Sequence, residues 1–126
     1  VPTALPALTL SEKLQARAAR VNFDWPDTSF VYDKLAEELE EFRAEEKSGD
    51  QARMTAELGD ILFVLANLAR HNGIDPEMAL RATCDKFKRR FRYMEQIVAN
   101  NNENMIDKSL NELDALWDEA KGLEDQ

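Results

Sequence analysis

The chain has 126 residues, of which 44% are hydrophobic, and its 25 acidic and 16 basic residues give a formal net charge of −9. This length suits one compact domain that buries about two thirds of the surface exposed by its unfolded form. The acidic balance argues against duplex nucleic acid as a partner, because such binding needs Lys and Arg to neutralise phosphates.

Few helix-breaking residues interrupt the sequence, which contains only four glycines and four prolines. This composition predicts an all-α fold. Periodicity and capping signals predict a bundle of about five helices. The longest apolar stretch, Ile61 to Ala66, is too short to span a membrane. The single cysteine, Cys84, cannot form an internal disulfide and fits a reducing compartment. We therefore expect a cytoplasmic protein with no membrane partner.

The first ten residues, VPTALPALTL, contain two prolines and no basic n-region of a signal peptide. We interpret residues 1–10 as a linker or boundary segment and residues 11–126 as the folded domain. The first helix is expected to run from about Ser11 to Val21, with Thr9 as its candidate cap.

The second and third helices are predicted to form a pair. Asp27 or Ser29 can cap the second helix, which is expected to end near Lys47. A Ser-Gly-Asp turn at residues 48–50 then leads into a third helix that reaches about His71. Because the connection is short, we expect an antiparallel hairpin.

The Asp-Pro-Glu sequence at residues 75–77 is typical of a helix start, since it combines a capping carboxylate, a proline and an acid near the positive end of the dipole. This fourth helix is predicted to reach about Ala99, before an Asn-rich loop. Capping-box spacing at Ser109 and Glu112 then predicts a final helix that extends to about Lys121.

Two groups of carboxylates lie on the helices that are predicted to pair. On the second helix, Glu41 is four residues from Glu37 and three from Glu38, so it shares a helix face with each. On the third helix, Glu57 and Asp60 are three residues apart and directly precede an apolar run. At about 1.5 Å per residue, an antiparallel hairpin brings both groups to a similar height. Up to five carboxylates would then surround a small volume.

Such a group of carboxylates would repel one another unless divalent cations neutralised them. Oxygen ligands in a chain whose only histidine is His71 favour Mg²⁺, with Mn²⁺ as the alternative. The competing interpretation is that these acids simply face solvent, because the chain contains 25 of them. Gly59, inside a helix at a cost of roughly 1 kcal/mol relative to alanine, suggests the close approach of another helix or a ligand. Together, the two groups favour a functional site.

The pattern EExxE followed by ExxD resembles the hallmark of the MazG nucleoside triphosphate pyrophosphohydrolases, an all-α family. It consists here of Glu37, Glu38, Glu41, Glu57 and Asp60. The surrounding sequences FDWP, AELGDILF, NLARH and KFKRRF resemble the C-terminal domain of two-domain MazG proteins, over nearly the whole chain. The resemblance implies Mg²⁺-dependent cleavage of a nucleoside triphosphate between its α and β phosphates, which yields nucleoside monophosphate and pyrophosphate.

The resemblance also implies a role for each acid of the motif. Glu38, Glu41, Glu57 and Asp60 would bind Mg²⁺. Glu37, adjacent to Glu38 but rotated about 100° around the helix, would orient or deprotonate the attacking water.

Basic residues would complete the substrate site. Lys86 and Arg90 are four residues apart in KFKRRF and share a helix face, which by itself fits a solvated surface. The resemblance instead implies that they contact the phosphates. Lys34, one turn before the second-helix acids, and Trp25 in FDWP would line the nucleotide pocket, although a structural role suits Trp25 equally well.

Trp117 and Lys121 resemble a Trp and Lys pair that approaches the nucleotide, since tryptophan can stack on a base. A tryptophan that anchors the last helix is the alternative. His71, at a helix end, is predicted to bond a terminal carbonyl or to interact with the helix dipole, and Cys84 is predicted to be packed as a small residue. Relatives with Asn at the position of Cys84 would gain a contact to metal or substrate that Cys84 lacks.

The family implies a homodimer, which apolar side chains of the third helix would permit: Ile61, Val64, Leu65 and Leu68. The alternative function is a non-catalytic helical module that serves dimerisation or regulation of a larger protein and binds no Mg²⁺. A ferritin-like di-iron bundle is set aside because it requires Glu-x-x-His pairs, whereas the residue three before His71 is Leu68.

Overall fold

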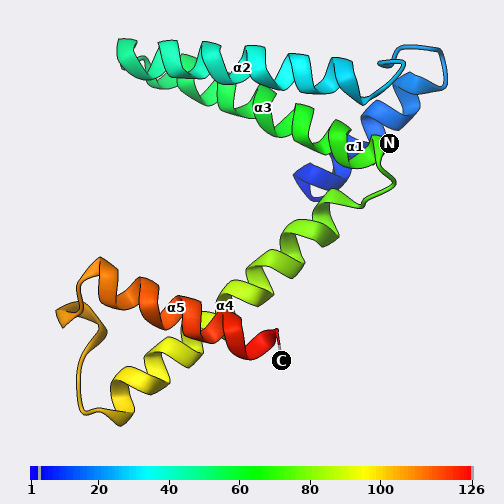
Figure 1. The fold of residues 1–126 in the computed structure, drawn as a ribbon. Coiled ribbons are helices and arrows are strands. Elements are labelled where there is room, and N and C mark those ends of the chain that lie inside the picture. The colour runs from blue at the N-terminus through cyan, green and yellow to red at the C-terminus, as the bar shows by residue number, and fades with distance from the viewer. Residues whose placement is uncertain (3, 126) are drawn as a thin grey trace. The chain divides into compact units, whose positions relative to one another are not determined.

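The computed structural model describes residues 1, 2 and 4–125. Within these residues the chain is helical and contains no strand, which confirms the all-α prediction. The elements are α1 (Ala7–Ala19), α2 (Thr28–Ser48), α3 (Gln51–His71), α4 (Pro76–Asn100), the 3₁₀ helix η1 (Met105–Asp107) and α5 (Leu110–Glu124), as Figure 1 shows. The chain divides into two compact units, Val1–Ala79 and Leu80–Gln126. None of the described helices is long and apolar enough to cross a membrane.

The α2–α3 hairpin forms where the sequence predicts it. The Asp27 side chain caps α2 by accepting from the Ser29 amide at 2.8 Å. Gly49 ends α2 with a φ of 72°, a left-handed conformation that glycine adopts without strain. Asp50 then begins α3 by accepting from the Arg53 amide at 3.1 Å. The two helices lie side by side in Figure 1, so the predicted hairpin is confirmed.

Helix α1 begins earlier than predicted. The Leu10 amide donates to the Pro6 carbonyl at 2.8 Å, and the Ser11 hydroxyl donates to the Ala7 carbonyl at 2.8 Å. Residues 7–10, which we interpreted as part of a linker, are therefore helical. The proposed Thr9 cap is wrong because Thr9 lies inside the helix, which starts after Pro6.

Helix α3 organises the first unit because it packs against both α1 and α2. Its Ile61 and Ala66 are buried, as is Val31 of α2. Ile61 was predicted to belong to an apolar face available to a second copy, and its burial within the chain corrects that expectation. The large apolar side chains that α3 leaves exposed are Leu58, Leu62, Phe63 and Leu65.

In the second unit, α4 and α5 share a small core of Met94, Val98 and Ala120, all buried. The predicted capping box of α5 is confirmed. The Glu112 amide donates to the Ser109 hydroxyl at 3.1 Å, and the Ser109 amide donates to the Glu112 carboxylate at 3.2 Å. Local sequence signals therefore set the start of this helix.

Candidate metal centre and adjoining cavity

Three carboxylates meet between α2 and α3. Glu38, Glu41 and Glu57 each offer one oxygen, and these oxygens lie within 4.8 Å of one another. We call these three residues the acid cluster. Glu38 is only 4% exposed, Glu57 is half-buried and Glu41 is exposed. The hairpin thus places acids from both halves of the sequence motif around one point.

Two oxygens of the acid cluster have nothing to bond. Glu38 Oε2 and Glu57 Oε2 are buried and lack a hydrogen-bond partner among the described residues. Buried polar atoms almost always have partners, so this pair of oxygens is suited to binding an ion or a water molecule. Burial, together with the nearby Glu38 and Glu41, raises the pKa of Glu57 to about 7. A cation at this point would reverse that penalty.

Lys34 is the one residue in the described part of the chain that forms an ion pair with the acid cluster. Its Nζ lies 3.0 Å from Glu38 Oε1 and 3.6 Å from Glu37 Oε1. The hydrogen bond from Lys34 lowers the pKa of Glu38 despite burial, and the same bond raises the pKa of Lys34. One ammonium against three carboxylates leaves the acid cluster negative, which suits a divalent cation.

The other two acids of the motif lie outside the acid cluster. Asp60 follows Glu57 by one turn of α3 and is exposed. The Glu37 side chain is 58% exposed and contacts Lys34. At Gly59, an added Cβ would meet no described atom within 4 Å, so no other helix of the described chain approaches it closely, and the approach of a ligand stays a prediction. The roles of Glu37 and Asp60 stay predictions.

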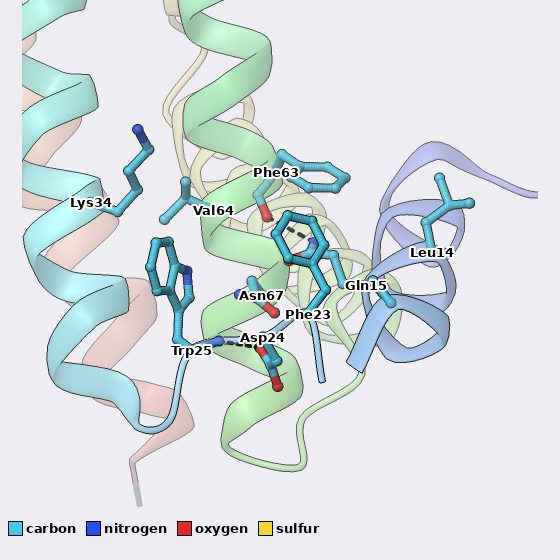
Figure 2. A pocket seen from close by; sticks show the side chains of 10 residues that line it. Leu14, Gln15, Phe23, Asp24, Trp25, Lys34, Phe63, Val64 and Asn67 are labelled. Carbon is cyan, nitrogen blue, oxygen red and sulfur yellow. Dashed lines mark hydrogen bonds between the residues drawn. The ribbon is translucent and has the colours of Figure 1, made fainter. Parts of the chain in front are cut away.

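A cavity of about 330 Å³ lies beside the acid cluster and opens between α1, α2, α3 and the loop that follows α1 (Figure 2). Lys34 lines this cavity and also contacts Glu38, so one side chain joins the two features. Most of the wall is apolar or aromatic, with a few polar groups, as is usual for small-molecule sites. The lining residues are Leu14, Gln15, Ala18, Phe23, Asp24, Trp25, Lys34, Phe63, Val64 and Asn67.

Aromatic rings of the loop after α1 line this cavity. Trp25 is 41% exposed and stacks on Phe30, with centroids 6.2 Å apart and planes within 7°. Phe23, also on the wall, is 80% exposed. Large exposed rings in a concave site offer flat apolar surface to a planar ligand. The position of Trp25 supports the pocket interpretation made from FDWP.

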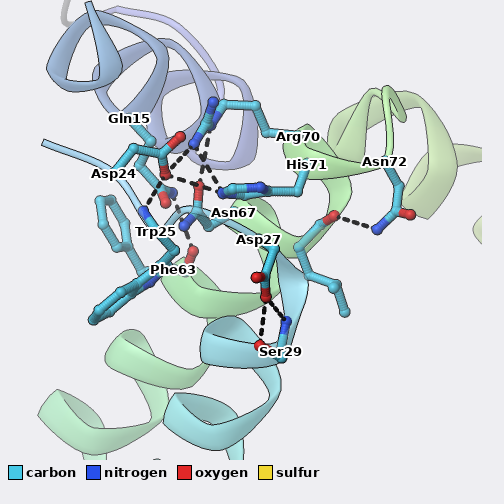
Figure 3. Close-up of polar contacts among 11 residues, drawn as sticks. Gln15, Asp24, Trp25, Asp27, Ser29, Phe63, Asn67, Arg70, His71 and Asn72 are labelled. Carbon is cyan, nitrogen blue, oxygen red and sulfur yellow. Dashed lines mark hydrogen bonds and ion pairs between the residues drawn. The ribbon is translucent and has the colours of Figure 1, made fainter. Parts of the chain in front are cut away.

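A polar network holds this loop against the end of α3 (Figure 3). Asp24 Oδ1 lies 2.6 Å from Arg70 Nη2 and 3.0 Å from His71 Nε2, and it accepts from the Trp25 amide at 2.8 Å. Burial would raise the pKa of Asp24, but hydrogen bonds from Arg70, His71 and the Trp25 amide lower it overall. Unlike the acid cluster, this carboxylate has one oxygen on which three neighbouring groups converge.

His71 lies in the last turn of α3, as the helix-dipole alternative requires, but its ring nitrogen contacts Asp24 instead of bonding a helix-terminal carbonyl. Asn72 takes that role, since its side-chain amide donates to the Leu68 carbonyl at 2.9 Å. Asp24 and Arg70, on which the network depends, were not identified from the sequence. They lie 46 positions apart in the numbering, and neither belongs to a recognisable motif.

In the second unit, Arg90 is occupied by neighbours within that unit. Its guanidinium donates to Glu124 Oε2 at 3.0 and 2.9 Å and lies 5.1 Å from the Trp117 ring centroid. Phe87 packs on the same tryptophan at 5.5 Å between centroids. Trp117 therefore joins α5 to α4, as the anchoring alternative predicts. Contacts of Arg90 with phosphate and of Trp117 with a base stay predictions.

The remaining residues singled out in the second unit are more open. Lys86 is half-buried and Lys121 is exposed, so both can reach solvent. Their proposed contacts with substrate stay predictions. Cys84 is exposed, which makes the prediction of a packed cysteine wrong.

Comparisons with known proteins agree on one family. The model of the MazG nucleotide pyrophosphohydrolase domain matches residues 29–94. The chain is 41% identical over 126 residues to a nucleoside triphosphate pyrophosphohydrolase of Escherichia coli (strain K12), covering 98% of this chain and 48% of that protein. It is 37% identical over 118 residues to the nucleoside triphosphate pyrophosphohydrolase/pyrophosphatase MazG of Thermotoga maritima. That match covers 94% of this chain and 45% of the Thermotoga protein.

A shorter match, 49% identical over 71 residues, links the chain to the uncharacterized protein YabN of Bacillus subtilis (strain 168), covering 56% of this chain and 14% of that protein. The chain spans about half the length of the first two relatives. The region that matches the family includes the acid cluster and Lys34, whereas Trp117 and Lys121 lie beyond it.

Proposed function

Because the chain belongs to the MazG nucleotide pyrophosphohydrolase family, we propose that it hydrolyses nucleoside triphosphates between the α and β phosphates. The products are nucleoside monophosphate and pyrophosphate. The observation that carries the proposal is the pair of buried, unpartnered oxygens on Glu38 and Glu57 beside a cavity lined by aromatic rings. One end of the site can hold a cation and the other a planar group.

The proposed cofactor is Mg²⁺, with Mn²⁺ as the alternative. Glu38, Glu41 and Glu57 would hold it, with Asp60 as a further ligand from the next turn of α3. Their donors are all carboxylate oxygens, the ligand type that hard divalent cations prefer. When bound, Mg²⁺ neutralises the triphosphate and stabilises the charge of the leaving pyrophosphate.

Glu37 is the proposed water-handling residue. Its carboxylate is exposed and adjoins Lys34, so it stands beside the acid cluster without belonging to it. A water that donates a hydrogen bond to Glu37 attacks the α phosphorus, and its oxygen forms the new P–O bond. The bond from that phosphorus to the α–β bridging oxygen breaks, pyrophosphate leaves, and Glu37 accepts the proton.

The substrate would extend from the acid cluster into the cavity. Trp25 offers a stacking surface for the base, and Lys34 lies between base and metal. Lys86 and Arg90 are proposed to contact the phosphates, and Trp117 and Lys121 to approach the nucleotide. We also propose that the protein works as a cytoplasmic homodimer, which would cover the exposed apolar side chains of α3.

Release of pyrophosphate by the purified chain tests the proposal. A panel of canonical, deoxy and oxidised triphosphates is assayed with Mg²⁺ and with a chelator. Glu38→Gln and Asp60→Asn should abolish metal-dependent release while helix content is retained. Glu46→Gln, an exposed acid on the same helix as Glu38, is the matched control and should keep the wild-type rate.

Unchanged turnover in Glu38→Gln or Asp60→Asn would refute the site assignment. If the wild-type chain releases no pyrophosphate from any triphosphate, and calorimetry with Mg²⁺ and a non-hydrolysable nucleotide gives no saturable heat, the non-catalytic module becomes the better account.

A further inference from the structure

One polar side chain of the cavity has a fixed orientation. Asn67 is only 7% exposed and lines the cavity from α3. Its Oδ1 accepts from Arg70 Nε at 3.1 Å. Because a guanidinium group can only donate, the amide atom that faces Arg70 must be the oxygen. The NH₂ group of Asn67 therefore points the other way.

That NH₂ group faces the cavity. Figure 2 shows the amide nitrogen of Asn67 on the side of Trp25, and in Figure 3 the amide oxygen is the atom that faces Arg70. The hydrogen bond found for the Asn67 side chain within the described residues is the one from Arg70 to its oxygen. Because Asn67 as a whole is only 7% exposed and its nitrogen faces the cavity, the natural complement of this donor is an acceptor atom of a ligand.

The orientation of Asn67 and the position of Trp25 depend on the same carboxylate. Asp24 Oδ1 holds Arg70 Nη2 at 2.6 Å and accepts from the Trp25 amide at 2.8 Å. Arg70, so held, fixes the Asn67 amide. The side chain of Arg70 is 19% exposed and that of Asp24 is 22% exposed, so solvent competes weakly with this ion pair. One polar network thus positions two groups that line the cavity.

We propose that Asn67 determines nucleoside specificity by donating from Nδ2 to an acceptor atom of the substrate, and that Asp24 and Arg70 are the residues that position it. The acceptor is a ring nitrogen of the base or a hydroxyl oxygen of the sugar. This inference rests on the proposed function, because it requires that the cavity receive the nucleoside.

Steady-state kinetics with ATP and its analogues provide the first test. Adenine has acceptors only at ring nitrogens, so 1-deaza, 3-deaza and 7-deaza ATP remove each in turn, while 2′-deoxy and 3′-deoxy ATP remove the sugar hydroxyls. For the wild-type protein, the analogue that lacks the contacted atom should lose about tenfold in kcat/KM, the equivalent of about one hydrogen bond. Equal kcat/KM for every analogue would overturn the proposal without any variant.

The second test asks whether Asn67 is the donor. Asn67→Asp keeps the size of the side chain and its contact with Arg70 but offers no donor when ionised. Its KM for ATP should rise about tenfold or more, with kcat within about twofold of wild type. The analogue that lacks the contacted atom should then have the same kcat/KM as ATP. Arg70→Met releases the amide and should likewise raise KM and weaken selectivity. Asn72→Asp, on the same helix end but outside the cavity, is the matched control and should change neither.

The outcomes separate this proposal from the proposed function. If wild-type protein hydrolyses ATP but Asn67→Asp keeps both KM and analogue selectivity, the specificity role is wrong and the activity stands. If wild-type protein neither hydrolyses ATP nor binds α,β-imido ATP by calorimetry, both proposals fail. Circular dichroism of each variant shows whether the helices remain. If a variant unfolds, the analogue series measured on the wild-type protein still tests the proposal.

Discussion

Two carboxylate sites contact α3, and they differ in how their charge is balanced. Asp24 contacts Arg70 and His71 and accepts from the Trp25 amide. The acid cluster combines three carboxylates with Lys34 alone, and two of its buried oxygens bond nothing in the described residues. At the first site, neighbouring protein groups balance the charge of the carboxylate. At the second, the described residues supply one ammonium group for three carboxylates.

The pKa shifts at the two sites have opposite directions for this reason. Hydrogen bonds outweigh burial at Asp24 and lower its pKa. At Glu57, burial and the neighbouring acids act together and raise the pKa to about 7. The balance of donors and cations around a carboxylate, rather than the number of acids, therefore distinguishes a structural site from a candidate ligand site.

The largest effect is expected from Glu57→Gln, which removes a proposed ligand but preserves side-chain size. Loss of partners that only orient a metal ligand commonly costs 10 to 100-fold, so loss of the ligand itself should lower Mg²⁺-dependent pyrophosphate release by at least about 100-fold. Initial-rate assays at saturating Mg²⁺ measure this. Activity within tenfold of wild type would remove Glu57 from the metal site.

Asp24→Asn should affect stability and KM rather than kcat, because Asp24 holds Arg70 and the Trp25 amide and not the acid cluster. The substitution leaves Arg70 without its 2.6 Å ion pair, which should lower the free energy of unfolding by about 1 to 3 kcal/mol. Urea unfolding followed by circular dichroism measures the loss, with Asp33→Asn as an exposed control on α2. If kcat falls as steeply as in Glu57→Gln while stability is unchanged, Asp24 belongs to the catalytic site instead.

The pH dependence of stability should also distinguish the sites. The pKa of Glu57 rises from 4.5 to about 7 on folding, so the folded state binds more protons between these values. In the metal-free protein, the contribution of Glu57 to the free energy of unfolding must then fall as the pH rises through this window. Glu57→Gln removes that penalty, and its gain in Tm over wild type should be larger at about pH 8 than at about pH 4.5.

Thermal melts in a chelator at both pH values check this prediction. An equal gain at both would mean that Glu57 is not destabilised by its neighbours. A gain in Tm seen only near about pH 4.5 would be the opposite of the predicted pH dependence and would show that repulsion at Glu57 does not destabilise the fold.

The smallest effect is expected from Lys34→Met. Lys34 competes with a metal for Glu38, since its ammonium lies 3.0 Å from that carboxylate. A partly exposed pair of this kind contributes up to about 1 kcal/mol, so the variant should bind Mg²⁺ up to about fivefold more tightly in the absence of nucleotide. Calorimetric titration measures the change. Weaker binding would show that Lys34 supports the site rather than competing for it.

Much of the fold follows from local sequence. Asp27, Asp50 and the Ser109 to Glu112 capping box begin their helices as predicted, because capping depends on residues within one turn. The start of α1 was missed because Pro6 suits the position before a helix as well as it suits a linker. Helix periodicity also placed Glu38, Glu41 and Glu57 at one height across the hairpin.

Contacts between distant segments were harder to predict. Asp24 meets Arg70 only because the loop after α1 returns to the end of α3, and no periodic pattern encodes that return. The cavity depends on the same return, although FDWP had indicated Trp25 as a pocket residue. Asp60 shares the motif with Glu57 but lies outside the acid cluster, which spacing alone could not reveal.

We propose that the acid cluster binds a divalent cation and that Asp24 does not. Calorimetric titration of Mg²⁺ into the nucleotide-free protein tests it most directly, with wild type, Glu57→Gln and Asp24→Asn compared. The account predicts saturable Mg²⁺ binding by wild type and Asp24→Asn, and its loss in Glu57→Gln. Saturable binding that survives Glu57→Gln but is lost in Asp24→Asn would contradict it.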